Sequence, residues 1–398
     1  MITTRRQLLV NGLRVVAAVP VLPYLGHARF SCIDEDGGAR VLVVLQLSGG
    51  NDALNMVVPR TQDAYFRLRP SLSLARGGLH GLDDDHGLHP EMGGLGELFE
   101  EGRLAIVHGV GYPNPNRSHF RSMEIWHTAD PDSPPGDSGW MGRLADQIAV
   151  ARPGSMAALH VGSGDLPLAL YGREYFSPTV RDPRGFQLKS PSKSYARWRD
   201  ELLAAGEPGG DLAFLREAAK SSYRAATRME EVAEKESPVA YPGHGLARHL
   251  QLVARLIVGD FGTRVFHVSL GGFDTHAQQK PLHAALLQEL SASLTAFQRD
   301  LEESGVADRV VTMVFSEFGR RARENASTGT DHGAAAPVLL VGSKVRAGMH
   351  GTAPDLGQLE NDDIPPTTDF RSIYTALEKG WMGLRPSTKL PALELFSS

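Results

Sequence analysis

Residues 41–52, with the sequence VLVVLQLSGGND, constrain the fold of this chain more than any other stretch. Six of the first seven residues are apolar and several are β-branched, which is typical of a strand buried on both faces of a parallel sheet. Gly49 and Gly50 then let the chain turn, so that Asn51 and Asp52 project from the carboxyl end of the strand. Ligands of open α/β sheets bind at that end. Asp52 is therefore interpreted either as a metal or substrate group or as a turn-forming residue.

The composition of the 398-residue chain is that of an ordinary globular protein, with 41% hydrophobic residues. This length suits one large α/β domain with insertions, or two domains. A formal net charge of −5 without a basic stripe argues against a general nucleic-acid-binding protein. The single cysteine, Cys32, excludes a disulfide within the chain and any Cys-x-x-Cys metal site. Beyond the N-terminal region, no segment is long and apolar enough to cross a bilayer.

Residues 1–28 are interpreted as an export signal. Arg5 and Arg6 precede a weakly hydrophobic region, a pattern that resembles a twin-arginine signal, and the Gly-His-Ala that ends the segment fits a small-x-small cleavage site. The alternative is a short amphipathic helix. The signal predicts a periplasmic or secreted protein, and because twin-arginine export carries folded proteins, a metal can be bound before export. Residues 29–398 are then expected to form a single domain.

Strands and helices are expected to alternate along that domain, because apolar runs alternate with segments whose apolar residues recur at helical spacing. The expected strands are 41–47, 104–108, 264–270, 310–315 and 338–341, and the expected helices are 140–150, 211–235, 246–259, 282–301 and 368–381. The span 60–100 is expected to be rich in loops. Residues 151–245, rich in Pro, Gly and Arg, are interpreted as an insertion or lid over the carboxyl edge of the sheet.

Acidic residues recur where the later strands end. Asp274 and His276 follow a second pair of glycines, Glu317 follows strand 310–315, and Asp331 and His332 stand shortly before strand 338–341. Any one of these is most simply a helix cap or a surface residue, but carboxylates that converge in a cleft repel one another unless a cation neutralises them. Carboxylate oxygens and imidazole nitrogens both bind divalent metals. The sequence therefore predicts a divalent ion (Zn, Ca, Mg or Mn) held by Asp52, Asp274, His276, Glu317, Asp331 and His332.

Ser118 follows a stiff Pro-Asn-Pro-Asn-Arg run and stands where a helix is expected to begin. The free N–H groups at a helix N-terminus favour an anion and stabilise an alkoxide. Ser118 is thus interpreted either as an N-cap alone or as a nucleophile. The tetrad Gly-Asp-Ser-Gly at 136–139 lies in a Pro-rich loop unlike that of a β-barrel protease, and no G-x-S-x-G elbow is present.

The motifs LQLSGGND, RSHF, GGFDTH, FSEFGRR, GTDHG and TTDFR, in this order, closely resemble the family of exported bacterial proteins called DUF1501. The resemblance extends over essentially the whole mature chain. That family is grouped with the alkaline phosphatase and sulfatase superfamily and has no generally established reaction. The resemblance implies an alkaline phosphatase-like α/β fold, with a doubly wound, mostly parallel sheet, helices on both faces and a loop-rich, helical insertion. It also implies metal ligands on loops at the carboxyl ends of the strands.

By motif, Asp52 resembles the first-strand aspartate of the superfamily, Ser118 its helix-capping nucleophile, and Asp274 with His276 its acid-plus-His loop. Glu317 falls where an aspartate ends a strand, and His332 where a histidine precedes one. This chain departs from the superfamily in having Glu317-Phe318 where Asp-His is usual, and in the close spacing of 274 and 276. These departures favour a single-metal or altered site. Cys32 lacks the C/S-x-P-x-R context of a formylglycine sulfatase, which disfavours that class.

Two functions follow as hypotheses. The first is a metal-dependent hydrolase of phosphate or sulfate esters in the cell envelope, acting on a small-molecule or glycan anionic ester. In it, Ser118 or a water attacks, and Arg320, Arg321 or Arg121 holds the anionic oxygens by bidentate contacts. The alternative is a non-catalytic exported binding or assembly protein that kept the scaffold but lost a ligand. Fold analogy alone does not assign the chemistry.

Overall fold

The computed structural model describes residues 39–132, 136–152, 155–181, 227–232 and 234–397. The predicted signal at 1–28 lies outside these residues, as does most of the expected helix 211–235, of which 227–232 are helical. Within the described residues, no helix combines the length and the apolar character needed to span a membrane.

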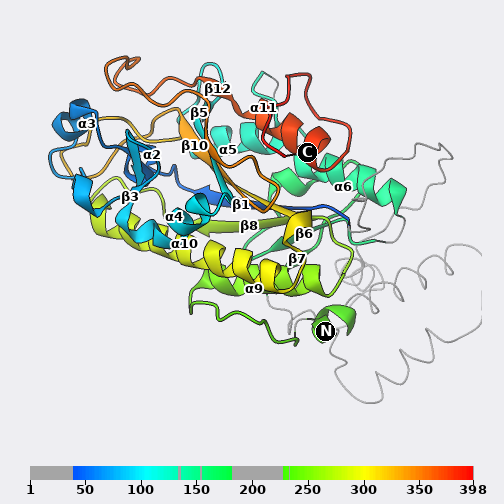
Figure 1. Cartoon of the computed structure of the whole chain (residues 1–398). Helices are drawn as coiled ribbons and strands as arrows, with labels where there is room; N and C mark the ends of the chain where they lie inside the picture. The colour runs from blue at the N-terminus through cyan, green and yellow to red at the C-terminus, as the bar shows by residue number, and fades with distance from the viewer. Residues whose placement is uncertain (1–38, 133–135, 153–154, 182–226, 233, 398) are drawn as a thin grey trace, which may run out of the picture.

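A mostly parallel sheet forms the centre of the described structure (Figure 1). The nine strands described there run in the order β11-β5-β10-β9-β1-β8-β6-β7, with β12 paired to β5. Of these, β10 runs antiparallel to both β5 and β9, and the other pairs are parallel. The strands are β1 (Val41–Ser48), β5 (Leu104–Gly111), β6 (Ala158–Val161), β7 (Thr179–Val180), β8 (Val265–Gly271), β9 (Val310–Ser316), β10 (Ala336–Val341), β11 (Gly348–His350) and β12 (Thr368–Asp369).

Helices cover both faces of this sheet, as Figure 1 shows. On one face lie α4 (Gly93–Glu100), α9 (Gly245–Val258) and α10 (Gln279–Glu303), and on the other lie α5 (His119–Thr128), α6 (Trp140–Ala151) and α11 (Phe370–Thr375). Strand β1 serves both cores, because successive side chains point to opposite faces. Its Val43 and Leu45 join the core under α9 and α10, whereas Leu42 and Val44 join the core under α5 and α6. The predicted α/β class, with a mostly parallel sheet between two helical layers, is confirmed.

The span 60–100 is more regular than its sequence indicates. It contains α3 (Asp63–Leu68), α4 and two strands of a small separate sheet, β3 (His80–Gly81) and β4 (His86–Leu88), which join β2 (Val57–Pro59); the four-residue α2 (Ala53–Met56) precedes them. Helix α4 has the glycine-rich sequence GGLGELFE, which has low helix propensity. Tertiary packing, and not helix propensity, accounts for this helix, since a Cβ at Gly94 would overlap the Thr295 side chain of α10. The absence of that Cβ lets the two helices approach closely.

Two further expectations differ from the structure in detail. The closing helix, expected from 368, begins at Phe370 because the Asp369 side chain caps it by accepting from the N–H of Arg371, while 368–369 form β12. It continues as a π-helical segment, η6 (Ala376–Trp381). The expected insertion at 151–245 includes β6 and β7, so its first part belongs to the central sheet, and 182–226 lie outside the described residues.

Candidate metal centre

The loops that follow β1, β8 and β9 pack tightly against one another at the carboxyl edge of the sheet. Gly49 and Gly50 have φ angles of +123° and +76°, which glycine adopts far more readily than other residues. A Cβ on Gly49 would overlap the backbone of Phe273 and Asp274, and one on Gly50 would overlap the Phe318 ring. The paired glycines therefore allow these three strand ends to meet, as the sequence predicts.

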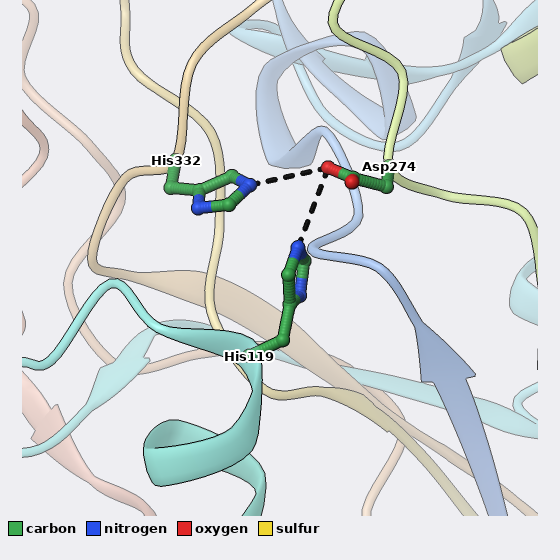
Figure 2. Close-up of side chains that lie close together, drawn as sticks. All are labelled: His119, Asp274 and His332. Carbon is green, nitrogen blue, oxygen red and sulfur yellow. Dashed lines mark hydrogen bonds and ion pairs between the residues drawn. The ribbon is translucent and has the colours of Figure 1, made fainter.

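Two imidazoles face one carboxylate at this edge (Figure 2). The Nε2 atom of His332 lies 3.1 Å from Oδ1 of Asp274, and Nε2 of His119 lies 3.4 Å from the same oxygen. These three side chains each offer one ligand atom, and the three atoms lie within 4.8 Å of one another. His119 comes from the first turn of α5, Asp274 from the loop after β8, and His332 from the loop before β10.

A third imidazole completes the arrangement. Nε2 of His276 lies 3.0 Å from Oδ1 of Asp274 and 2.9 Å from Nε2 of His332. Neighbouring ligands of a zinc-like ion with bonds of about 2.0–2.2 Å are about 2.8–3.6 Å apart in tetrahedral or octahedral geometry. The observed separations fall in that range. Oδ1 of Asp274 and Nε2 of His276 and His332 are thus mutually spaced as neighbouring ligands of one metal ion would be, and Nε2 of His119 lies at such a distance from Asp274.

The hydrogen bonds made by Nδ1 of His119 and His332 indicate that the Nε2 atoms of these rings are free to bind a cation. Nδ1 of His119 lies 2.8 Å from Oε1 of Glu317, and Nδ1 of His332 lies 2.8 Å from the carbonyl oxygen of Arg117. Both partners are acceptors, so each Nδ1 must donate. Each Nε2 then carries either a lone pair or a second proton, and its contact with Asp274 is favourable only if a positive charge lies between them. Because Nε2 of His119 is buried without a hydrogen-bond partner in the described residues, this donor set fits a divalent metal.

His119 was not among the residues that the sequence predicted. It comes from a different element than the predicted ligands, and Phe318 packs against the rings of His119 and His332 at centroid distances of 4.9 and 4.7 Å. Its signal in the sequence was its place beside Ser118, at the first position of a helix that starts at the same edge of the sheet.

Glu317, a predicted ligand, lies behind this layer rather than within it. Its side chain is 2% exposed, and its Oε1 accepts from the N–H of Gly49 at 2.9 Å as well as from His119. A carboxylate in this position fixes the ring orientation of a metal-binding histidine and raises the basicity of its other nitrogen. Asp331 lies in a similar place for His276, with 3.5 Å between its Oδ1 and Nδ1 of the ring, but its side chain is 59% exposed.

Asp52 is separate from the imidazole cluster. Its Oδ2 forms an ion pair of 2.6 Å with Nη1 of Arg69, and neither side chain has any exposed surface. Burial on its own would raise the pKa of Asp52, but the Arg69 charge and hydrogen bond outweigh it and hold the pKa below its usual value. For Asp274, burial likewise acts to raise the pKa, but the hydrogen bond and charge of Arg320 together with the neighbouring His332 and His276 outweigh it and lower the pKa to about 2. Both groups are therefore carboxylates at neutral pH, but only Asp274 faces the histidines.

Arg320, predicted to hold the anionic oxygens of a substrate, is fully buried and bonded within the protein. Its N–H groups are directed to Asp274 Oδ1 (2.7 Å), to His276 Nε2 (3.5 Å) and to the carbonyl oxygens of Gly49, Gly50 (2.7 Å), Phe273 (3.1 Å) and Thr330 (2.8 Å). A guanidinium has five N–H donors, and four of them are taken up by protein oxygens here. The assignment of Arg320 is corrected accordingly, because it joins the three ligand loops and orients Asp274 rather than facing a substrate.

Ser118 occupies the N-cap position of α5, as predicted. Its side chain makes no capping hydrogen bond and the residue is exposed, whereas its backbone N–H donates to Oδ1 of Asn116 at 2.8 Å. The hydroxyl is thus free of the structural role that an N-cap usually has, and it adjoins His119 in the chain. The two interpretations of Ser118, as an N-cap alone or as a nucleophile, therefore predict different effects of removing its hydroxyl.

The model of the family described as "Protein of unknown function (DUF1501)" matches residues 39–385. The resemblance indicated by the sequence motifs is thereby confirmed. No curated protein matches the chain.

Three solved structures show a distant likeness. The C-terminal periplasmic domain of EcEptC from Escherichia coli, in complex with Zn, has 10% identity and a TM-score of 0.38, with 78% of this chain and 75% of that chain covered. A protein in the alkaline phosphatase superfamily from Vibrio parahaemolyticus has 13% identity and a TM-score of 0.34, covering 79% and 62%. The PsFucS1 sulfatase from Pseudoalteromonas sp. has 12% identity and a TM-score of 0.38, covering 89% and 70%.

Proposed function

The chain belongs to the DUF1501 family, and from that premise we propose that it is a metal-dependent hydrolase of phosphate or sulfate esters in the cell envelope. The observation that carries the proposal is the convergence of three imidazole Nε2 atoms on one oxygen of Asp274. An imidazole-rich donor set favours Zn²⁺ over Ca²⁺, Mg²⁺ and Mn²⁺, which prefer oxygen ligands. The substrate class is a small-molecule or glycan anionic ester.

A divalent ion bound here would supply Lewis acidity, polarising an ester oxygen and neutralising developing negative charge. The chain supplies the rest. His119, His276 and His332 with Asp274 would hold the ion, and Glu317 and the Arg117 carbonyl keep the rings of His119 and His332 in place. The Ser118 hydroxyl, at the N-terminus of α5, is the proposed nucleophile, because the positive end of the helix favours its alkoxide.

One observation favours the alternative, a non-catalytic exported binding or assembly protein. Arg320 is fully buried and bonded within the protein, so it does not hold the anionic oxygens of a substrate. A binding protein would still need the metal centre but would turn over no ester. The two functions are therefore separated by catalysis and not by metal content.

The test combines metal analysis with a substrate screen. Purified mature protein is expected to hold a divalent metal and to hydrolyse at least one of p-nitrophenyl phosphate, bis-p-nitrophenyl phosphate and p-nitrophenyl sulfate. Asp274→Ala and His332→Ala should lose both metal and thermal stability, since a ligand that binds only the folded state stabilises it. His244→Ala, at an exposed histidine that makes no side-chain cap bond, is the matched control. Metal binding without hydrolysis would favour the alternative. A protein that neither binds metal nor hydrolyses an ester would overturn both proposed functions.

Export by the twin-arginine route is proposed from the sequence of residues 1–28. Replacing Arg5 and Arg6 together by Lys is expected to leave the protein in the cytoplasm, because the arginine pair is the recognised feature. Cell fractionation measures this. Delivery of the double variant by the general secretory route would contradict the assignment.

A further inference from the structure

Arg69 and Asp52 form an ion pair that is fully withdrawn from solvent. Arg69 stands at the end of α3, outside the central sheet, and its guanidinium reaches the loops after β1 and β9. Besides Asp52, it donates to the carbonyl oxygens of Arg321 and Ala322 and to Oδ1 of Asn55, each at 2.9 Å. Every nitrogen of the guanidinium is therefore bonded to the protein, and its position is fixed.

The pair removes the need for a metal ion at Asp52. A buried carboxylate is strongly unfavourable unless a cation lies beside it, and removing one partner of such a pair leaves the other charge uncompensated. Here the cation is part of the chain. Arg69 supplies the charge compensation for this carboxylate through Oδ2. Its other oxygen, Oδ1, has no hydrogen-bond partner in the described residues.

A continuous series of hydrogen bonds links this pair to the metal centre. The Gln279 side-chain amide donates to Oδ2 of Asp52, and the Thr330 hydroxyl donates to Oε1 of Gln279 at 2.6 Å. Arg320 then donates to the Thr330 carbonyl at 2.8 Å and to Oδ1 of Asp274 at 2.7 Å. Asp52, Gln279, Thr330 and Arg320 are all buried, so water does not compete for these bonds.

We propose that Arg69 and Asp52 are positioning residues of the metal centre, acting on Asp274 through Gln279, Thr330 and Arg320. Arg69 serves as a fixed internal cation at Asp52, so that the centre binds one divalent ion per chain. The inference rests on the metal site of the proposed function but not on any hydrolytic activity. It differs from an ordinary structural ion pair in predicting that metal affinity depends on the pair.

The main test is the double variant Asp52→Asn/Arg69→Met, which removes both charges at nearly constant volume. Neutral replacement of a whole buried pair usually preserves folding. We expect the metal-free variant to melt near the wild-type temperature, yet to bind Zn²⁺ about tenfold more weakly in competition with a chelator, as for loss of outer-sphere support. Wild type and variant should each bind one Zn²⁺. The control Arg299→Met/Glu101→Gln removes a partly exposed pair and should leave the affinity unchanged.

A second variant keeps the test decisive if the first does not fold. Thr330→Val removes the hydroxyl that links Thr330 to Gln279 but leaves the Arg69–Asp52 pair intact. It should weaken Zn²⁺ binding several-fold. Wild-type Zn²⁺ affinity in either folded variant, or two Zn²⁺ ions per wild-type chain, overturns this inference while leaving the metal centre standing. Absence of Zn²⁺ binding by the wild type overturns both.

Discussion

Asp52 and Asp274 begin from nearly the same local sequence and end in different chemistry. Each follows a buried strand and a pair of glycines, and the two strands, β1 and β8, are parallel neighbours. Asp52 is sealed in the interior against Arg69, whereas the side chain of Asp274 is 49% exposed and surrounded by imidazoles. The strand-glycine-acid motif thus places a carboxylate, and residues distant in sequence decide what the carboxylate does.

The difference lies in the source of positive charge. Asp52 receives it from a side chain that is always protonated, so no bound ion is required there. Asp274 shares Arg320 with four backbone carbonyls and a histidine, and it still faces His119 and His332. One aspartate therefore has its counter-charge within the chain, and the other is open to a cation from outside. Each prediction below changes the surroundings of one of these two aspartates.

Acidification is expected to have the largest effect on the stability of the folded chain, and it acts on the buried surroundings of Asp52. His89 and His283, close to Asp52, are buried, and burial lowers the pKa of each from 6.5 to about 4. The unfolded chain takes up these protons below pH 6.5 while the folded chain does so only near pH 4. Stability is therefore full above pH 6.5 and falls between pH 6.5 and 4, by up to about 1.4 kcal/mol per pH unit for each histidine.

Urea unfolding of the metal-free protein from pH 8 to 4 measures this loss. His283→Gln cannot take up a proton and should show a shallower decline than the wild type. A free energy of unfolding that stays constant between pH 7 and 4.5 would contradict the account of these buried histidines.

The single variant Arg69→Met should destabilise the metal-free protein by about 3–5 kcal/mol, because it leaves Asp52 buried without a counter-charge. Chemical denaturation gives the value directly. Adding Asp52→Asn should restore most of the loss. If the single and double variants are equally unstable, the loss comes from packing and not from charge.

Asp274→Ala should weaken Zn²⁺ binding by more than about 100-fold, beyond the range expected for outer-sphere residues. The reason is that its Oδ1 is the atom on which the three imidazoles converge. Its effect on the metal-free protein should be smaller than that of Arg69→Met, since Asp274 is half exposed. Chelator competition and denaturation of the same samples give both numbers, and near wild-type Zn²⁺ affinity would remove Asp274 from the site.

The smallest change in stability is expected for Ser118→Ala. Its side chain makes no capping hydrogen bond, so the free energy of unfolding should change by less than about 0.5 kcal/mol. Metal content should also stay unchanged, whereas turnover of any ester found in the screen should be lost. A fully active Ser118→Ala protein would show that water attacks instead.

The sequence predicted the sheet and the meeting of its strand ends, because buried β-branched runs followed by glycine pairs have few other arrangements. It also predicted Asp274, His276 and His332, which the structure brings together. His119 was not predicted because it does not follow the end of a strand. The sequence did not predict that Asp52 lies apart from the imidazole cluster. Arg69 lies in a span expected to be loops and reaches Asp52 only through tertiary packing.

Anomalous diffraction at the zinc edge, from crystals of the mature protein grown with Zn²⁺, tests the central claim most directly. The account predicts one strong peak per chain, within bonding distance of Nε2 of His119 and His332 and of Oδ1 of Asp274. It predicts no peak at Asp52, where Arg69 already lies. A peak coordinated by Asp52, or no peak beside Asp274 in a Zn²⁺-saturated crystal, would contradict it.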